Sequence, residues 1–560
     1  MRSPLGKIKT TQVLESATLR DFSGGLNTLD DDLNLARKYS RRLDNIRYDG
    51  ANSNRVRFGT EFHVDINDYT TSSGNALVNA TYFQANLIAV ASNGEILAVG
   101  ADKTTTRIFD AVIAAALPGA PAGWSATDFC SFAVFNNELI ICNGVDKPLL
   151  VRNDLSVEYL ADQATGSNIN TPIGKYVTVC NRYLIISGDP VNPTRVHISA
   201  KDTSGTFYGD PAPNDATYVD VGSSLRGSTL IRGIADFRGK LVVAFAEGIV
   251  IGTVGIYDTT GVIHEPVFDD NVEEHGGISH RTLLSFGDDM LYLGLQGIPA
   301  LKRTIFTGSL RPEYISDIIA EDLLPLMSPL SDGALEDNTF SVYDQREGVF
   351  MFFVPNASTV AETTETKCFC YTYRPNLRVE AWNTYSGWNW TCAVKTLQGN
   401  IFFGTADGKL FRFGNKDNPV YKDFVGDYAV NNGEGAAINF DWELAWAEFG
   451  SRVETKTTRY ISFDTRGSGA FTCDMYCDQL MTDADGNDAP QLTMDFTGGD
   501  NQGFGSSLVG YGGGRTTGDE RLYGWPAKFK LAKLRFRGAV EDELAFVSIT
   551  LFFMKGGYLR

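Results

Sequence analysis

Cysteine and histidine are both scarce in this chain of 560 residues, which has eight cysteines and five histidines. Cys368/Cys370 and Cys473/Cys477 are close pairs, but neither has the C-x-x-C spacing that a zinc ribbon uses twice. Both pairs lie in stretches that are typical of strands, so we expect buried thiols, with a metal site or a disulfide as the alternative. So few histidines also leave little material for acid–base chemistry.

The chain also lacks long hydrophobic runs and an excess of positive charge. No apolar stretch approaches the roughly 18–20 residues that cross a bilayer, and the N-terminus lacks the apolar core of a secretory signal. We therefore expect no membrane span and synthesis in a cytoplasm without export. The net charge of −19 argues against a protein that binds nucleic acid by neutralising phosphates. It does not argue against a protein that lets nucleic acid pass.

Helical periodicity is rare along the chain. It is found at residues 30–46, near 110–116 and at 315–327. Elsewhere short β-rich runs alternate with turn residues, which predicts an all-β protein with few short helices.

Hairpin signals recur between residues 80 and 415. The predicted turns lie at Asn93-Gly94, Asn136-Asn137, Asn181-Arg182, Arg238-Gly239, Asp288-Asp289, near Arg346, at Gly399-Asn400 and at Asp407-Gly408. Their spacing is close to the ~40–50 residues of a four-stranded blade, so we predict a β-propeller of about seven blades, with six to eight as the range. The Trp-Asp, kelch and Asp-box signatures are absent, which leaves a β-sandwich or a set of barrels as alternatives.

The composition changes after residue 415. Residues 416–437 are polar and rich in Gly and Asn, and residues 438–560 show the clean alternation of an antiparallel β-sandwich. We predict an N-terminal arm and helix at 1–75 that packs on this platform, a propeller at 76–415, a linker at 416–437 and a sandwich-like domain at 438–560. A Gly-rich stretch at 497–520 is a candidate for a subunit contact or a gate.

No stretch supports a cofactor or a metal. A phosphate-binding loop with G-x-x-x-x-G-K-[ST] is absent. Asp30, Asp31 and Asp32 are consecutive and cannot all face one ion, so we interpret them as the first turn of the helix at 30–46. Residues 483–488 resemble a calcium loop, but the spacing favours a hairpin turn.

Two further clusters have a functional and a structural interpretation. Acidic residues and two histidines gather at 269–280, namely Asp269, Asp270, Glu273, Glu274, His275 and His280. They would suit a hydrolase or a metal site, but we favour the alternative that they form a solvated loop between strands. Trp382, Tyr385, Trp388 and Trp390 could form a platform that stacks on sugars or bases, or they could fill the core between blades. Neither cluster gives positive support for an enzyme, and we predict none.

Three stretches together resemble one family. Residues 21–59 contain a Phe-x-Gly-Gly-Leu-Asn turn, a Leu-x-x-x-x-Ser-x-x-x-x-Asn segment and an Arg-x-Gly, with the matching residues Phe22, Gly24, Gly25, Leu26, Asn27, Leu35, Ser40, Asn45, Arg57 and Gly59. Residues 186–207 and 275–301 are similar to two propeller strands of that family, and 438–464 to its late Trp-x-x-Phe-Gly segment. The chain resembles the tail nozzle (tail tubular protein B) class of short-tailed bacteriophages. It is shorter than the better-known members.

This resemblance implies a structural virion protein made in the host cytoplasm. The class forms a ring, commonly a homohexamer, in the tail below the adaptor (head-to-tail connector) ring and next to tail fibres or spikes. Its lumen is sealed before infection and then conducts the genomic DNA during ejection. An acidic lumen would let the duplex slide without specific binding.

The segment at residues 21–50 fits a subunit contact better than a ligand site. Its spacing fails the phosphate and metal templates, and we expect it to touch a neighbouring subunit. The residues expected there are Phe22, Gly24, Gly25, Arg37, Arg41, Arg42 and Arg47. The alternatives for the whole chain are a receptor- or glycan-binding propeller that uses Trp388 and Trp390, and a propeller hydrolase that uses Glu274 and His275.

Overall fold

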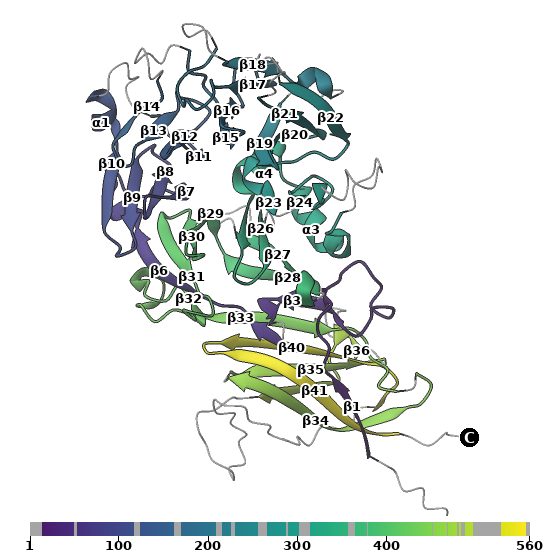
Figure 1. Ribbon diagram of the computed structural model, residues 1–560. Coiled ribbons are helices and arrows are strands. Elements are labelled where there is room, and N and C mark those ends of the chain that lie inside the picture. The colour runs from purple at the N-terminus through teal and green to yellow at the C-terminus, as the bar shows by residue number, and fades with distance from the viewer. Residues whose placement is uncertain are drawn as a thin grey trace, which may run out of the picture. The chain divides into compact units, whose positions relative to one another are not determined.

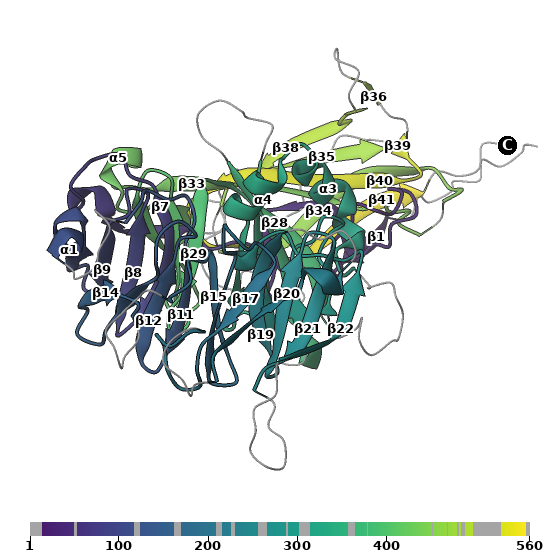
Figure 2. The same ribbon diagram turned by 90° about the horizontal axis from the view of Figure 1, so that it is seen from above.

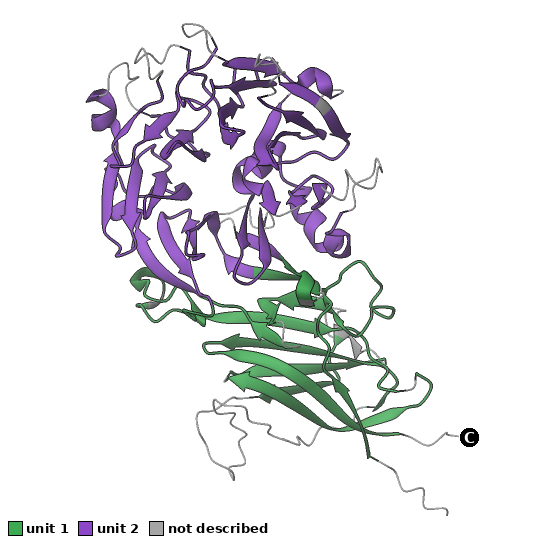
Figure 3. Cartoon of the chain, viewed as in Figure 1, with its two compact units in different colours: residues 1–59, 371–385, 416–560 green, residues 60–370, 386–415 purple. Residues whose placement is uncertain are grey.

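The chain folds into two compact units. The computed structural model describes residues 14–49, 53–116, 124–161, 170–208, 215–225, 230–255, 266–286, 289–301, 314–356, 365–377, 379–450, 452–467, 469–478, 481–482, 488–496 and 528–555. Unit 1 comprises residues 1–59, 371–385 and 416–560, and unit 2 comprises residues 60–370 and 386–415 (Figure 3). Each unit is therefore built from segments that are far apart in the sequence.

Unit 2 is a propeller whose first four blades are regular four-stranded antiparallel sheets. The first blade contains β7 (Leu77–Phe83), β8 (Asn86–Ala91), β9 (Ile96–Gly100) and β10 (Thr105–Phe109). The second contains β11 (Ser131–Phe135), β12 (Glu138–Cys142), β13 (Leu149–Val151) and β14 (Val157–Tyr159). The third contains β15 (Tyr176–Cys180), β16 (Tyr183–Ser187), β17 (Arg195–Ile198) and β18 (Thr217–Asp220), and the fourth β19 (Ile231–Phe237), β20 (Lys240–Phe245), β21 (Gly248–Thr253) and β22 (Val267–Glu273).

The remaining blades are less regular. The fifth is a hairpin of β23 (Leu284–Phe286) and β24 (Asp289–Leu291), extended by isolated bridges such as Leu291–Ala300. The sixth contains β25 (Phe340–Asp344), β26 (Val349–Pro355) and the first part of β27 (Thr366–Arg374). The seventh contains β29 (Trp390–Lys395), β30 (Ile401–Thr405), β31 (Lys409–Phe413) and β6 (Thr60–Asp65). The predicted propeller of about seven blades is therefore observed.

The ring of blades is closed by a strand from the beginning of unit 2. β6 precedes the first blade in sequence but pairs antiparallel with β31 as the outermost strand of the last blade, with Leu410 opposite Val64. The inner strands β7 and β29 then lie side by side, as do β11 and β15, β15 and β19, and β25 and β29. Figure 1 shows these sheets following one another around a common centre.

Apolar side chains fill the seams between blades and explain why the strands are apolar on both faces. One core joins the first and second blades through residues such as Ile88 and Ile141, and another joins the third and fourth through Ile185 and Val243. A blade exposes two apolar faces, so it is stable only between neighbours. The predicted hairpin turns follow this plan: Asn136 and Asn137, for example, adopt positive φ between β11 and β12.

Unit 1 is a sandwich of two mainly antiparallel sheets. One sheet has the order β39 (Lys528–Phe529), β34 (Lys456–Gly467), β41 (Leu544–Lys555), β5 (Asn54–Val56) and β4 (Ile46–Tyr48), with β1 (Leu14–Leu19) also on β41. The other has the order β28 (Val379–Trp388, through Tyr385 in this unit), β2 (Gly25–Leu26), β3 (Tyr39–Asp44), β33 (Ala436–Leu444), β40 (Ala532–Val540), β35 (Phe471–Cys477) and β38 (Leu492–Phe496), with β32 (Lys422–Asp423) on β33. β28, β2 and β3 pair with one another in parallel, while β3, β33, β40 and β35 pair antiparallel.

An aromatic core holds the two sheets together. The Phe536 ring of β40 lies 5.6 Å from that of Phe463 on β34 and 5.5 Å from that of Phe546 on β41. The Trp442 ring of β33 is 5.2 Å from Phe546. Such aromatic pairs contribute to stability beyond the area that they bury. The two sheets packed around this core confirm the predicted sandwich-like platform.

Two of the three predicted helices are present. α1 (Ala111–Ala116) matches the expected stretch near 110–116, and the short 3₁₀ turn Asp317–Ile319 with α3 (Ala320–Met327) matches 315–327. α4 (Asp332–Asn338) follows α3 and begins at Ser331, whose hydroxyl accepts a hydrogen bond from the Ala334 N–H. In Figure 2, α3 and α4 lie at the same end of the blade strands.

The predicted helix at 30–46 is wrong. Residues 31–36 form turns, and residues 39–44 form β3, which pairs with β2 on one side and β33 on the other. Within β3, Ser40 and Leu43 are buried while Arg42 is exposed. Hydrogen bonds to two neighbouring strands therefore override a local pattern that resembles a helix.

The observed units also differ from the predicted boundaries. β6 belongs to the propeller and not to an arm at 1–75, and residues 416–437 belong to the sandwich, where β32 and α5 (Tyr428–Asn431) are ordered, so they are not a linker. β36 (Met481–Thr482) pairs with β37 (Asp488–Ala489), as a hairpin around 483–488 requires. Residues 483–487 themselves and the Gly-rich stretch 497–520 lie outside the described residues.

Candidate functional site

The segment at residues 21–50 is integrated into the sandwich. Phe22 is buried and packs edge-on against Trp442 of β33, with ring centroids 5.0 Å apart. Gly24 and Gly25 run close to the neighbouring strands: a Cβ on Gly25, whose φ is +70°, would lie 2.6 Å from the Trp382 carbonyl oxygen. These three residues are therefore inside unit 1 and are not available to another subunit.

The arginines of this segment divide into buried and exposed members. Arg47 is buried, and its guanidinium lies 4.4 Å from the centre of the Phe58 ring. Arg41 is partly buried, donates to the Thr28 carbonyl and pairs with Asp32 at 3.0 Å. Arg37 and Arg42 remain largely exposed, with side-chain exposures of 49% and 60%. Of the seven predicted interface residues, only these two present a charged, accessible surface.

The acidic–histidine stretch does not converge on a site. His275 is buried, and its Nδ1 is 2.7 Å from the Tyr314 hydroxyl, whereas Glu273 and Glu274 are exposed. The backbone N–H of Ile234 donates to His280 Nδ1 at 3.3 Å, and burial lowers the pKa of His280 to about 4. Among the described residues, no group of three or more His, Cys, Asp or Glu side chains could hold a metal ion.

The aromatic cluster at 382–390 is core and not an exposed platform. Trp382, Tyr385, Trp388 and Trp390 are each at most 3% exposed. Within unit 2, the Trp390 ring stacks on Phe403 with centroids 5.2 Å apart. A sugar or a base cannot reach these faces without unfolding the blade.

The cysteines are likewise structural. All eight are buried and free of disulfides, which confirms the predicted buried thiols. The thiols of Cys368 and Cys370 are within hydrogen-bond distance, with their Sγ atoms 3.6 Å apart, and do not form a disulfide. Burial raises the pKa of Cys392 to about 11 and that of Cys477 to about 12, so these thiols are inert at neutral pH.

The side chain of Arg281 crosses the axis of the propeller. Arg281, just before the fifth blade, donates to the Val78 carbonyl of β7 at 3.3 Å and to the Thr391 carbonyl of β29 at 3.1 Å. It also donates to the Asp337 carbonyl of α4. In a ring of seven, the fifth and first blades face each other, so a side chain that contacts both must cross the centre.

A second buried network anchors α4 over the third and fourth blades. The Glu336 carboxylate is 4% exposed and accepts hydrogen bonds from Lys175, Tyr176 and Arg232. Burial alone would raise the pKa of Glu336, but the adjacent Lys175 and Arg232 charges outweigh it and lower the pKa. Lys175 is further held by Asp337 at 2.8 Å.

These networks can close and brace the propeller, but they do not form a catalytic centre. The carboxylate of Glu336 is saturated by donors and is held ionised, so it is a poor general acid or base near neutral pH. Sequence reasoning did not find either network. The available signal was a charged residue inside a mainly apolar strand, such as Arg232 in the stretch Ile231–Phe237, which also contains Asp236.

The fold defines the class of this protein as a seven-bladed β-propeller combined with a β-sandwich. No protein-family profile matches the chain, and no curated protein matches it in sequence. No helix in the described part of the chain is long and apolar enough to cross a bilayer.

Several solved structures are similar to part of the chain. PorZ of the Porphyromonas gingivalis type-IX secretion system is 14% identical with a TM-score of 0.35, and the match covers 60% of this chain but only 36% of PorZ. The WD40 propeller domain of Doa1 is 11% identical with a TM-score of 0.33, covering 64% of this chain and 99% of that domain. YCF48, solved with a D1 peptide, is 10% identical with a TM-score of 0.36, covering 67% and 98%. Similarity at this level gives no information about ligands or partners.

Proposed function

We propose that this chain is a structural subunit of the tail nozzle of a short-tailed bacteriophage, which assembles as a ring, seals the packaged genome and conducts it during ejection. The observation that carries the proposal is that residues of the motifs that resemble the tail nozzle class pack together in unit 1. Phe22 packs on Trp442, and the Trp442 indole N–H donates to the Ser40 hydroxyl at 2.9 Å. Asn45 accepts from Arg57 Nε at 2.6 Å. Residues of the first motif stretch, 21–59, thus pack against one another and against a residue of the last stretch, 438–464, within unit 1.

The same cluster continues through a buried ion pair. Arg57 is 1% exposed and donates two hydrogen bonds to the Asp423 carboxylate, at 2.9 Å and 2.7 Å. Gly59, the last residue of the motif, lies so close to Lys422 that a Cβ would be 1.9 Å from its carbonyl oxygen. The motif therefore has a structural explanation as the frame of the sandwich, and a ligand is not needed to account for it.

Charge and the closed axis support a conduit made between subunits. Arg281 spans the propeller axis of a single chain, so a duplex needs a lumen formed by several copies. Closed rings arise from heterologous contacts that repeat around an axis. The net charge of −19 per chain disfavours tight binding of the passing DNA.

Electron microscopy of the purified chain with its adaptor partner tests the proposal. We expect closed rings, commonly hexamers, and no retention of duplex DNA at physiological salt. Light scattering that finds only monomers in the presence of the adaptor ring would overturn it.

Charge reversal of the exposed arginines tests their predicted part in the ring. Arg37→Glu and Arg42→Glu should weaken assembly if these side chains meet an acidic neighbour, whereas Lys240→Glu on β20, which is exposed in the propeller, serves as the control. Rings that form equally well with both arginines reversed would remove the segment at 21–50 from the interface and leave the ring itself in place.

A further inference from the structure

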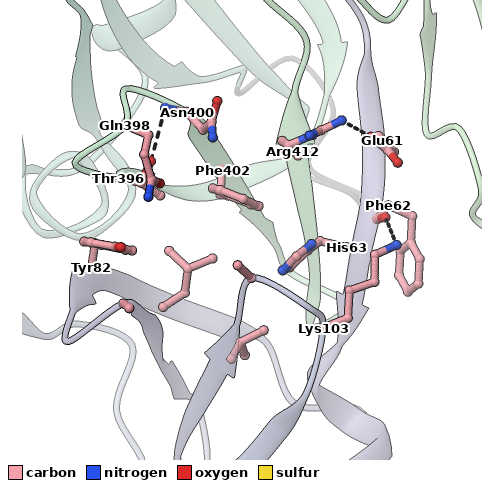
Figure 4. A pocket seen from close by; sticks show the side chains of 14 residues that line it. Glu61, Phe62, His63, Tyr82, Lys103, Thr396, Gln398, Asn400, Phe402 and Arg412 are labelled. Atoms are coloured by element: carbon pink, nitrogen blue, oxygen red, sulfur yellow. Dashed lines mark hydrogen bonds and ion pairs between the residues drawn. The ribbon is translucent and has the colours of Figure 1, made fainter. Parts of the chain in front are cut away.

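A pocket of about 300 Å³ lies at the seam between the first and last blades, within unit 2. β6 forms one wall of this seam pocket, and the turn between β29 and β30 forms the opposite wall (Figure 4). The side chains that matter for its chemistry are Glu61, His63, Lys103, Asn400, Phe402 and Arg412. Its volume is at the lower end of the about 300–1,000 Å³ of small-molecule sites, which suits a ligand with a single ring.

His63 is a buried polar group with an unmet hydrogen bond. It is 7% exposed, and its Nε2 has no hydrogen-bond partner among the residues that the structure describes. The backbone of Gly100 is a hydrogen-bond partner of the ring, and the ring packs edge-on against Phe402 with centroids 5.0 Å apart. Burial and the nearby Lys103 charge lower the pKa of His63. The imidazole is therefore neutral, and a ring that donates to the Gly100 carbonyl from Nδ1 offers Nε2 as an acceptor.

The charge of the pocket determines which charge a ligand should carry. Arg412 is paired with Glu61, so these two side chains cancel. Lys103 donates to the Phe62 carbonyl at 3.2 Å and has no carboxylate within ion-pair distance in the described part of the chain. One positive charge thus remains at the rim of a pocket in a chain whose net charge is −19.

The wall opposite Lys103 is neutral and polar. Figure 4 shows Thr396, Gln398 and Asn400 on that wall, with the Phe402 ring between them and His63. Amides, a hydroxyl and an aromatic face together recognise a ring that bears hydroxyl groups. A simple carboxylate such as acetate would use Lys103 but would leave His63 Nε2 without a donor, because it carries no O–H or N–H group at neutral pH.

We propose that the seam pocket binds an acidic sugar residue, with its carboxylate on Lys103, a hydroxyl donated to His63 Nε2 and an apolar ring face against Phe402. The buried acceptor calls for a hydroxyl donor, and the uncompensated ammonium calls for an anion. A hydroxylated ring that carries one carboxylate supplies both. This site is independent of the nozzle proposal and would give the propeller a way to contact acidic glycans.

Titrations of the full chain with glucuronate, glucose and acetate, followed by saturation-transfer NMR and calorimetry, test the proposal. We expect glucuronate to bind at millimolar concentration, glucose to bind more weakly and acetate not to compete. Lys103→Gln should weaken glucuronate about tenfold, because one charge-assisted hydrogen bond is lost, and should leave glucose unchanged. Lys240→Gln, an exposed lysine outside the pocket, is the matched control.

His63→Phe keeps an aromatic ring beside Phe402 but removes the acceptor, so it should weaken both sugars. Lys103 is exposed, so the lysine variant remains informative even where the histidine variant fails to fold. The proposal is overturned by a wild-type chain that binds neither sugar, by acetate that binds as tightly as glucuronate, or by glucuronate affinity that is unchanged in Lys103→Gln. The natural ligand is the end of a glycan chain if an oligosaccharide with a terminal uronate binds as well as free glucuronate. It is a free sugar acid if only the monosaccharide binds.

Discussion

Replacing Glu336 with glutamine tests whether the buried network on α4 stabilises the propeller. The substitution preserves the shape of the side chain but removes the charge that Lys175 and Arg232 share. It also places an amide N–H₂ group where a carboxylate oxygen accepted a hydrogen bond. Tyr176, which is 1% exposed, depends on the same carboxylate for its hydroxyl.

The expected loss of stability depends on the ion pairs that Lys175 and Arg232 keep after the substitution. Removing one partner of a buried ion pair typically costs about 3–5 kcal/mol. Lys175 keeps Asp337 at 2.8 Å and Arg232 keeps Asp332 at 3.5 Å, and both cations are partly exposed. We therefore expect Glu336→Gln to lower the free energy of unfolding by an amount at the lower end of this range, about 3 kcal/mol. At about 2 °C per kcal/mol for a large domain, the propeller transition should shift down by about 6 °C.

The effect should also depend on pH. The folded-state pKa of Glu336 is lowered, so its stabilising contribution is present above the unfolded value and is lost as the pH falls through the folded value. The difference in the free energy of unfolding between wild type and Glu336→Gln should thus be largest at neutral pH. It should shrink below about pH 4.3, the usual pKa of a glutamate side chain.

Calorimetry from pH 7 to pH 3 measures both features, with Glu273→Gln as the control because Glu273 is an exposed carboxylate on β22. The reasoning is refuted if Glu336→Gln unfolds like the control at neutral pH, or if its deficit stays constant as the pH falls.

Three further outcomes follow from single features of the fold. Gly25→Ala should destabilise the sandwich by more than the ~1 kcal/mol of a strained φ, because the new Cβ meets the Trp382 backbone; urea unfolding followed by tryptophan fluorescence measures this. Arg57→Lys keeps the charge but loses the bidentate hydrogen bonds to Asp423, and we expect the free energy of unfolding to fall by about 1–3 kcal/mol in the same assay. A fall of less than ~0.5 kcal/mol would contradict a stabilising role for this ion pair. The native chain should show almost no thiol reactivity, with all eight cysteines reacting after denaturation; rapid labelling of the folded chain would contradict the observed burial.

Local chemistry in the sequence was sufficient for much of the fold. Residues that tolerate positive φ, such as the pair Asn136 and Asn137, end one strand and begin the next whatever surrounds them. Strands that are apolar on both faces require neighbours on both faces, which predicts stacked blades. Alternation after residue 438 likewise predicted a sandwich, because it reflects one buried and one solvated face.

The candidate site was much less predictable. Glu274 and His275 are adjacent in sequence but differ in exposure, and Trp388 and Trp390 are buried. His63 and Phe402 gave no signal, since neither lies in a motif and they meet only when β6 joins the strands of the last blade.

The sequence by itself therefore determined the class of structure, the turns and an approximate number of blades, between six and eight, because these depend on backbone preferences and on the burial of neighbouring residues. The tertiary structure decided what residues 39–44 become, since β2 and β33 supply hydrogen bonds that a helix would forgo. It also decided the closure of the ring, in which Glu61 meets Arg412 from 351 residues away, and the crossing of the axis by Arg281. Pairing over such distances is selected by the packing of the whole domain and has no local signature in the chain.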